Sequence, residues 1–274
     1  MSSKHVVTAC TTGALLIASL AATTQARAEG ESPHSFTANV ALTTNYMFRG
    51  VSQTGNGPAV QGGFDYSYKP LGLYAGVWAS NVDSSSATGY YVVPGSNPPV
   101  VTTEDNPAGA ELVPLSAAGY DGASMELDLK LGWAQTFDKL GVDLGYLRYE
   151  YPMTNTEANN TNEYHLALSY DLTYLTPKVV VNYSDDFYGY GSAWYYDLTV
   201  AVPLPYDFSL TGHYGWTVYD DDDALNYDDY SVGIATTYAG VGFALSWIDR
   251  SKTENCISPF NCGSTAVFTI SKTF

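Results

Sequence analysis

Apolar and polar residues alternate along most of this chain. Between Glu126 and Ala134, leucines and a tryptophan occupy every second position, and Glu, Asp, Lys and Ala lie mainly on the other face. A period of two residues is typical of a β-strand with one apolar and one polar face. The same pattern recurs in about twelve segments from Phe36 to Phe274. The sequence therefore predicts an all-β protein of about twelve antiparallel strands.

The connections between these predicted strands sort by length. The connections after even-numbered strands are short turns, at 69–72, 138–141, 174–177, 203–206 and 238–240. Those after odd-numbered strands are longer and polar or glycine-rich, and the longest is 82–122. Such asymmetry is typical of a transmembrane antiparallel β-barrel with periplasmic termini, short periplasmic turns and long extracellular loops. We expect that fold, with 82–122 as an extracellular loop.

The last segment, Ala266 to Phe274, alternates in the same way and ends on an aromatic residue. An apolar edge strand would invite aggregation, whereas a closed barrel pairs the last strand with the first. We take the first strand to run from Phe36 to about Arg49. The terminal segment resembles the closing strand of bacterial outer-membrane barrels, although Lys272 departs from that pattern. This resemblance implies recognition by the barrel-assembly machinery.

Residues 1–28 have the features of a cleaved signal peptide. Lys4 and His5 precede an apolar run, and Ala26-Arg27-Ala28 forms a small-x-small cleavage site. The mature barrel is then 29–274. Loss of Lys4 and Arg27 lowers the 11 basic residues to 9 against 28 acidic ones, a formal charge of −19. This charge argues against nucleic acid as a partner.

The remaining composition indicates a membrane boundary. After the signal, no run approaches the roughly 18 to 20 consecutive apolar residues of a spanning helix. The chain has 24 Tyr, 10 Phe and 5 Trp with only 14% charged residues. Aromatic side chains favour membrane–water interfaces. We therefore expect the protein in the cell outer membrane, surrounded by lipid and lipopolysaccharide.

Three stretches of the first third carry a family resemblance. They are Asn45–Ser52, Pro58–Gly62 and Gly72–Asn81. With them the chain resembles a family of proteobacterial outer-membrane porin-like proteins, the TorF-like or Gcw_chp group, from about Phe36 to Phe274. The resemblance implies an outer-membrane barrel and a porin-like role, and it defines no activity or cofactor.

If the apolar faces meet lipid, the opposite faces line a lumen. The ionisable residues expected there are Asp65, Glu126, Asp128, Lys130, Asp143, Glu163, His165, Asp171 and Asp197. Carboxylates on a channel wall attract cations. We expect a pore for passive diffusion of small polar solutes or ions, mildly favouring cations. The alternative is that these charges pair across strands and fill the lumen, leaving a non-conducting structural or adhesin barrel that acts through its extracellular loops.

Arg49 is expected at the rim, because it directly follows the apolar residues of the first predicted strand. There it could bind an anionic solute or a lipid phosphate, or form an inward salt bridge with a lumen carboxylate.

An outer-membrane lipase or protease is a further alternative. His165 and Ser169 share one face, but four residues along a strand separate them by about 13 Å, too far for a nucleophile and its base. His213 has neither a serine nor an acid arranged near it in sequence. We therefore predict no enzyme activity and no cofactor.

Cys256 and Cys262 remain after the signal and lie close together in a polar loop. A pair of cysteines in an exported chain predicts a disulfide bond, and no companion residues suggest a metal site. The acidic segment 220–229 lacks the spacing of a calcium-binding loop.

Overall fold

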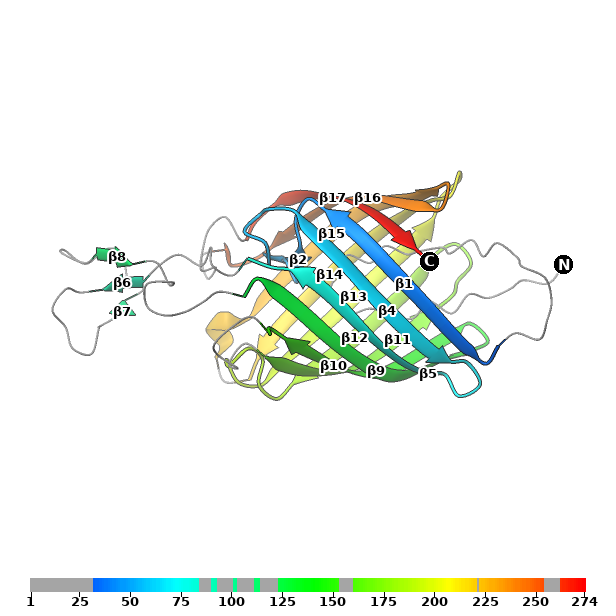
Figure 1. The fold of residues 1–274 in the computed structure, drawn as a ribbon, viewed down its shortest axis with the longest axis horizontal. Helices are drawn as coiled ribbons and strands as arrows, with labels where there is room; N and C mark the ends of the chain where they lie inside the picture. The colour runs from blue at the N-terminus through cyan, green and yellow to red at the C-terminus, as the bar shows by residue number, and fades with distance from the viewer. Residues whose placement is uncertain are drawn as a thin grey trace.

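The computed structural model describes residues 32–83, 90–92, 101–102, 111–113, 123–152, 160–220, 222–253 and 262–274. Twelve antiparallel strands form one closed barrel, in the order β1-β17-β16-β15-β14-β13-β12-β11-β10-β9-β5-β4 (Figure 1). This confirms the predicted all-β barrel. The predicted signal peptide and Cys256 lie outside the described residues.

Each barrel strand is about long enough to cross a bilayer when tilted. The strands are β1 (His34–Thr43), β4 (Ala59–Tyr68), β5 (Leu73–Asn81), β9 (Met125–Phe137), β10 (Leu140–Glu150), β11 (Thr161–Tyr170), β12 (Thr176–Ser184), β13 (Ala193–Pro203), β14 (Phe208–Tyr219), β15 (Tyr227–Tyr238), β16 (Val241–Arg250) and β17 (Thr265–Thr273).

The closing pair joins the two ends of the chain. β17 pairs with β1 from Asn39↔Thr273 to Thr43↔Thr269. The backbone N–H of Phe274 also donates to the carbonyl of Ala38 at 2.8 Å. The terminal segment therefore leaves no free sheet edge, as the alternating pattern predicts.

The two ends of the barrel differ in the length of their connections. At the turn end, short connections join β4 to β5, β9 to β10, β11 to β12, β13 to β14 and β15 to β16. At the loop end, the connection from β5 to β9 contains three short strands, β6 (Tyr90–Val92), β7 (Val101–Thr102) and β8 (Glu111–Val113), which form their own sheet. In barrels of this class the turn end faces the periplasm.

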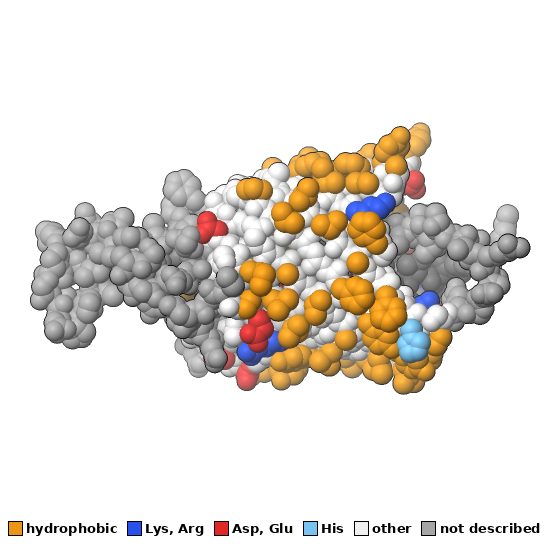
Figure 2. Space-filling model, in the orientation of Figure 1, with side chains coloured by type: hydrophobic (Ala, Val, Ile, Leu, Met, Phe, Trp, Pro, Cys, Tyr) orange, Lys and Arg blue, Asp and Glu red, His pale blue; other side chains and the backbone are white. Residues whose placement is uncertain are grey.

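Alternation separates an apolar outer wall from a polar inner one. On β11, Leu166 faces outward and is 42% exposed, while its neighbour Ala167 faces inward and is 3% exposed. Hydrophobic side chains are spread over the outside of the barrel (Figure 2). Because every strand repeats this arrangement, the apolar face is a continuous outer band. Among the described residues, no helix is long and apolar enough to span a bilayer.

The first strand is shorter than the sequence predicts. β1 ends at Thr43, and the chain then forms a hairpin of β2 (Met47–Phe48) and β3 (Val51–Ser52), separate from the barrel sheet. Met47 and Phe48 are adjacent and both buried. A strand of the barrel wall buries only one of two neighbours, so the periodicity of the wall has already ended here. This lumen hairpin, residues 45–53, is the feature that positions the candidate site.

Candidate functional site

The lumen hairpin turns at Arg49 and Gly50. Their φ angles are 47° and 75°, and they form a two-residue connection between Phe48 and Val51. Two positive φ angles in succession define the tight type I′ turn that suits a right-twisted hairpin. A Cβ atom at Gly50 would lie 2.8 Å from the Cβ of Arg250. The tip of the hairpin therefore packs directly against the inner wall.

Arg49 fastens the hairpin tip to the barrel. Its Nη2 donates to Oε1 of Glu163 on β11 at 2.6 Å, and the two side chains are 6% and 3% exposed. The guanidinium also lies 3.9 Å from the ring centre of Tyr195 and 5.1 Å from that of Phe187. A buried guanidinium that has both a carboxylate and aromatic faces is held in one geometry. The structure thus places Arg49 inside the barrel, in the inward salt bridge, and not at the predicted rim.

Tyrosine hydroxyls surround a second buried carboxylate, Glu126 on β9. Tyr46 donates to its Oε1 at 2.8 Å and Tyr151 donates to its Oε2 at 2.9 Å. The Tyr151 hydroxyl also lies 3.2 Å from that of Tyr188, in the loop after β12. Burial, together with nearby Glu126, raises the pKa values of Tyr46 and Tyr188, so both hydroxyls stay protonated. Glu126 is therefore satisfied without a cation.

These groups belong to a packed layer that we call the loop-end plug. Its members are buried and come from the hairpin, from the loop ends of the strands and from the loop after β12. They are Tyr46, Phe48, Ala59, Val82, Ala123, Leu147, Tyr149, Tyr151, Phe187, Ala193, Tyr219 and Tyr227. The plug fills the lumen with side chains near the loop end.

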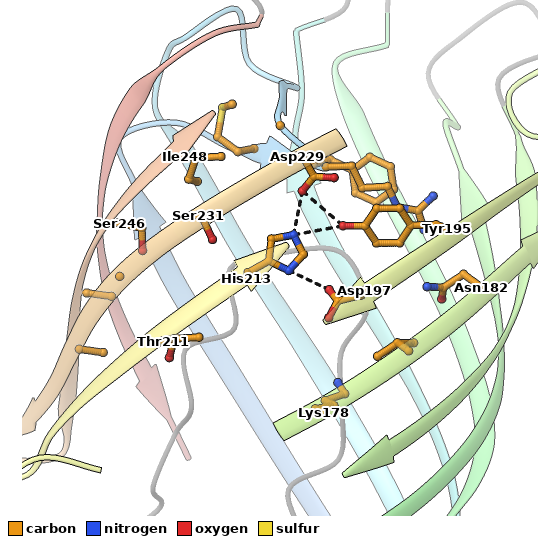
Figure 3. Close-up of a pocket in the computed structure, with 18 of the residues that line it drawn as sticks. Lys178, Asn182, Tyr195, Asp197, Thr211, His213, Asp229, Ser231, Ser246 and Ile248 are labelled. Atoms are coloured by element: carbon orange, nitrogen blue, oxygen red, sulfur yellow. Dashed lines mark hydrogen bonds and ion pairs between the residues drawn. The ribbon is translucent and has the colours of Figure 1, made fainter. Parts of the chain in front are cut away.

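A histidine bridges two carboxylates below the hairpin. The Nδ1 atom of His213 on β14 lies 3.0 Å from Oδ2 of Asp197, and Nε2 lies 2.8 Å from Oδ1 of Asp229. Figure 3 shows His213 between these acids, with Tyr195 beside it. A nitrogen facing a carboxylate must carry a hydrogen to bond to it, so this geometry suits the doubly protonated ring. The group ties β13, β14 and β15 together.

The opposite wall carries two more pairs. The Nε2 atom of His165 lies 3.2 Å from Oδ1 of Asp143, which also accepts from the Tyr74 hydroxyl at 2.9 Å. Nearby, Nζ of Lys130 lies 2.7 Å from Oδ1 of Asp65. His165 and Asp143 lie on the neighbouring strands β11 and β10, whereas Lys130 on β9 and Asp65 on β4 meet across Gly76 of β5.

A cavity of about 140 Å³ lies between the hairpin and the wall formed by β12 to β16. Its ionisable lining consists of Arg49, Lys178, Asp197, His213 and Asp229. Polar side chains, including Asn182, Thr211, Ser231 and Ser246, line it further (Figure 3). One water molecule needs about 10 to 15 Å³ of such space, so the cavity can hold several waters or one small solute. No group of three or more His, Cys, Asp or Glu side chains in the described ranges is placed to hold a metal ion.

Most of the ionisable residues predicted for the lumen lie on inner faces. Those buried or partly buried there are Asp65, Glu126, Asp128, Lys130, Asp143, Glu163, His165 and Asp197. Asp171 does not line the lumen, because β11 ends at Tyr170 and Asp171 lies exposed in the following turn. Its Oδ1 accepts from the backbone N–H of Thr173 at 2.7 Å, so it serves that turn.

Sequence reasoning missed four inward groups. Lys178, His213, Asp229 and Arg250 lie on inner faces. The acidic sequence 220–229 predicts a loop that includes Asp229, whereas β15 already begins at Tyr227. His213 has no acid near it in sequence, but Asp197 and Asp229 reach it from the two neighbouring strands. The alternation Lys178, Val180, Asn182 was the available signal for Lys178, since it sets these residues opposite Val179 and Val181.

The arrangement around His213 does not suit acid–base catalysis. Both ring nitrogens face carboxylates, so neither is left to accept a proton from a nucleophile.

At the loop end, Cys262 forms a backbone bridge with Val51 of the hairpin. Because Cys256 lies outside the described residues, the Cys256–Cys262 disulfide stays a prediction.

Comparison with known proteins agrees with this architecture. A family model described as a bacterial protein of unknown function (Gcw_chp) matches residues 27–274. The NanC porin structure aligns with a TM-score of 0.48 and 10% identity over 87% of this chain and 98% of that one. The KdgM porin in complex with disordered oligogalacturonate aligns with a TM-score of 0.50 and 6% identity, over 88% and 98%. No protein of curated function matches the sequence. The fold is a porin-like twelve-stranded barrel.

Proposed function

We propose that this chain, which belongs to the Gcw_chp family of bacterial proteins of unknown function, is a narrow outer-membrane channel. It carries small polar solutes or ions by passive diffusion, and the lumen hairpin sets its bore. The observation that carries this proposal is a cavity with charged and hydroxyl-bearing side chains in its lining, inside a closed barrel with an apolar outer band.

A mild cation preference is part of the proposal. The inward acids are Asp65, Glu126, Asp128, Asp143, Glu163, Asp197 and Asp229, and the inward permanent cations are Arg49, Lys130, Lys178 and Arg250. An excess of carboxylates on a channel wall favours cations. The preference is mild because ion pairs and tyrosine hydroxyls satisfy many of these carboxylates.

The surroundings of the barrel follow from the same proposal. The apolar band suits lipid and lipopolysaccharide of the cell outer membrane, reached after cleavage of residues 1–28 and with recognition of β17 by the barrel-assembly machinery. The Cys256–Cys262 disulfide would close the loop between β16 and β17. In this proposal the protein is not an enzyme and uses no cofactor.

A second candidate is a non-conducting structural or adhesin barrel that acts through its extracellular loops. The loop-end plug favours it, because buried side chains fill that end of the lumen. The two candidates differ in whether ions pass the hairpin.

Planar-bilayer recording separates them. Refolded residues 29–274 are compared with a variant in which 45–57 is replaced by a short Gly-Ser connection. We expect discrete openings from the wild type, and openings of larger conductance from the variant because its lumen is wider. In a KCl gradient, the reversal potential of the wild type should show that K⁺ permeates better than Cl⁻.

Heat-modifiable migration on a gel serves as the control that both barrels are folded. Silence from both folded proteins would establish the non-conducting barrel instead. Openings from the variant alone would mean that the hairpin closes the wild-type lumen.

A further inference from the structure

Lys178 is a buried cation without an internal partner. It lies on the inner face of β12 and is 9% exposed, yet its side chain makes no hydrogen bond or ion pair with any other residue that the structure describes. Lys130, three strands away on β9, instead lies 2.7 Å from Asp65. The Lys178 Nζ atom is not among the solvent-excluded side-chain atoms that lack a partner, so the ammonium group borders the space of the cavity. A solute that enters the cavity can therefore meet this charge directly.

The Lys178 side chain lines the cavity below the hairpin and extends into it (Figure 3). Each of the other charged groups of the cavity has a partner, although Oδ2 of Asp229 is buried and unpaired. Arg49 binds Glu163, and Asp197 and Asp229 both bind His213. Within this described lining, Lys178 is the charged group left to meet a solute.

The two carboxylates in the lining do not prevent an anion from binding there. Asp197 also accepts from the Thr199 hydroxyl at 2.8 Å, so both of its oxygens are occupied. The doubly protonated form of His213 that this geometry suits offsets one of the two negative charges. With Arg49 and Lys178 present, the lining does not repel a single negative charge.

We propose that Lys178 anchors a solute-binding site that takes the carboxylate group of a small organic acid or amino acid. This inference rests on the proposed function, since the solute reaches the cavity through the lumen. The ammonium group donates charge-assisted hydrogen bonds to the carboxylate. The hydroxyl groups of Thr211, Ser231 and Ser246 and the amide of Asn182 line the rest of the space.

The cavity favours a carboxylate over a phosphate. A phosphate brings up to two negative charges near Asp197 and Asp229, and the single ammonium of Lys178 offsets one of them. Phosphate sites generally rely on an arginine fork or on several backbone N–H groups. The one arginine in the described lining, Arg49, is already bound to Glu163.

The test is titration of the refolded barrel in detergent micelles with propionate, with its neutral counterpart propionamide, and with inorganic phosphate. Calorimetry measures affinity, and the ¹³Cε resonance of labelled Lys178, assigned by its loss in Lys178→Gln, reports contact. We expect propionate to bind and to shift that resonance, and Lys178→Gln to weaken propionate binding by about tenfold or more, the equivalent of one charge-assisted hydrogen bond. Propionamide and phosphate should bind weakly.

Lys130→Gln is the matched control, because it removes a lumen lysine that already has a partner. It should leave propionate binding unchanged. Equal propionate affinity in wild type and Lys178→Gln, or no shift of the Lys178 resonance, would overturn the site. If Lys178→Gln fails to fold, the resonance shift in the wild type still decides. Binding in micelles needs no ion flow, so a silent barrel that binds propionate refutes only the channel, and a conducting barrel that does not bind refutes only the site.

Discussion

At the scale of single residues, burial decides what an ion pair contributes. Arg49–Glu163 and Arg148–Glu150 have the same N–O separation of 2.6 Å. The side chains of the first pair are 6% and 3% exposed, and those of the second are both 31% exposed. Water can replace a lost partner for the second pair but not for the first. The two pairs therefore form a natural comparison within one barrel.

Glu163→Gln should destabilise the barrel by about 3 kcal/mol, because it leaves the buried Arg49 guanidinium without its carboxylate. Glu150→Gln, at the partly exposed pair, should cost less than about 1 kcal/mol. Urea unfolding of the two variants in lipid vesicles, followed by tryptophan fluorescence, measures both. Equal losses would show that Arg49 is hydrated and that the hairpin tip does not pack as described.

At the scale of elements, the lumen hairpin combines a local turn with long-range contacts. The turn requires two positive φ angles, and Gly50 adopts one of them readily, whereas an arginine such as Arg49 rarely adopts the other. The position of the hairpin depends on partners far along the chain, on β11, β13 and β16. The local sequence therefore favours the turn only in part, and the contacts of Arg49 inside the closed barrel hold the rest of it.

Gly50→Ala tests this packing. A Cβ atom there would meet the Cβ atoms of Arg250 at 2.8 Å and Asp229 at 3.0 Å, on a backbone with φ of 75°. We expect a loss of about 1 to 3 kcal/mol in the same urea assay. Gly212→Ala is the control, because its Cβ would have no atom within 4 Å, and it should change stability by less than about 0.5 kcal/mol. Similar values for the two variants would contradict a packed hairpin tip.

At the scale of the whole molecule, the outward apolar band implies a lipid environment. Leu131 lies within β9 and Phe137 is its last residue, and both side chains are 56% exposed. In water, the exposed large apolar side chains around the barrel would drive aggregation. In a bilayer the same residues meet acyl chains.

Leu131→Arg should therefore destabilise the barrel in lipid vesicles by about 2 to 4 kcal/mol, and Phe137→Arg, at the strand end, by about 0 to 1 kcal/mol. The difference measures depth in the bilayer, since the two side chains have equal exposure. Urea titrations in vesicles of uniform lipid composition provide the measurement. If both substitutions were neutral, the outer band would not be in contact with lipid.

Much of the fold could be predicted because β-strands signal themselves locally. Residues such as Leu129 and Leu131 mark one face of a strand, and prolines and glycines mark the turns between strands. Neighbouring strands in a meander are then paired by short connections. The candidate site could not be predicted in the same way. His213 meets Asp197 and Asp229 only because three strands lie side by side, and Asp229 lies next to an acidic loop that hid the start of β15.

The sequence by itself determined the strands, their two faces, the order of turns and loops and the closing role of the last segment. It could do so because alternation and turn chemistry depend on near neighbours. Only the tertiary structure decided that Arg49 lies inside with Glu163, that the residues after Thr43 enter the lumen, and that Lys178 is left without a partner. Those outcomes depend on which side chains meet across a closed barrel, and residues as far apart in the chain as Arg49 and Glu163 carry no local signal of that meeting.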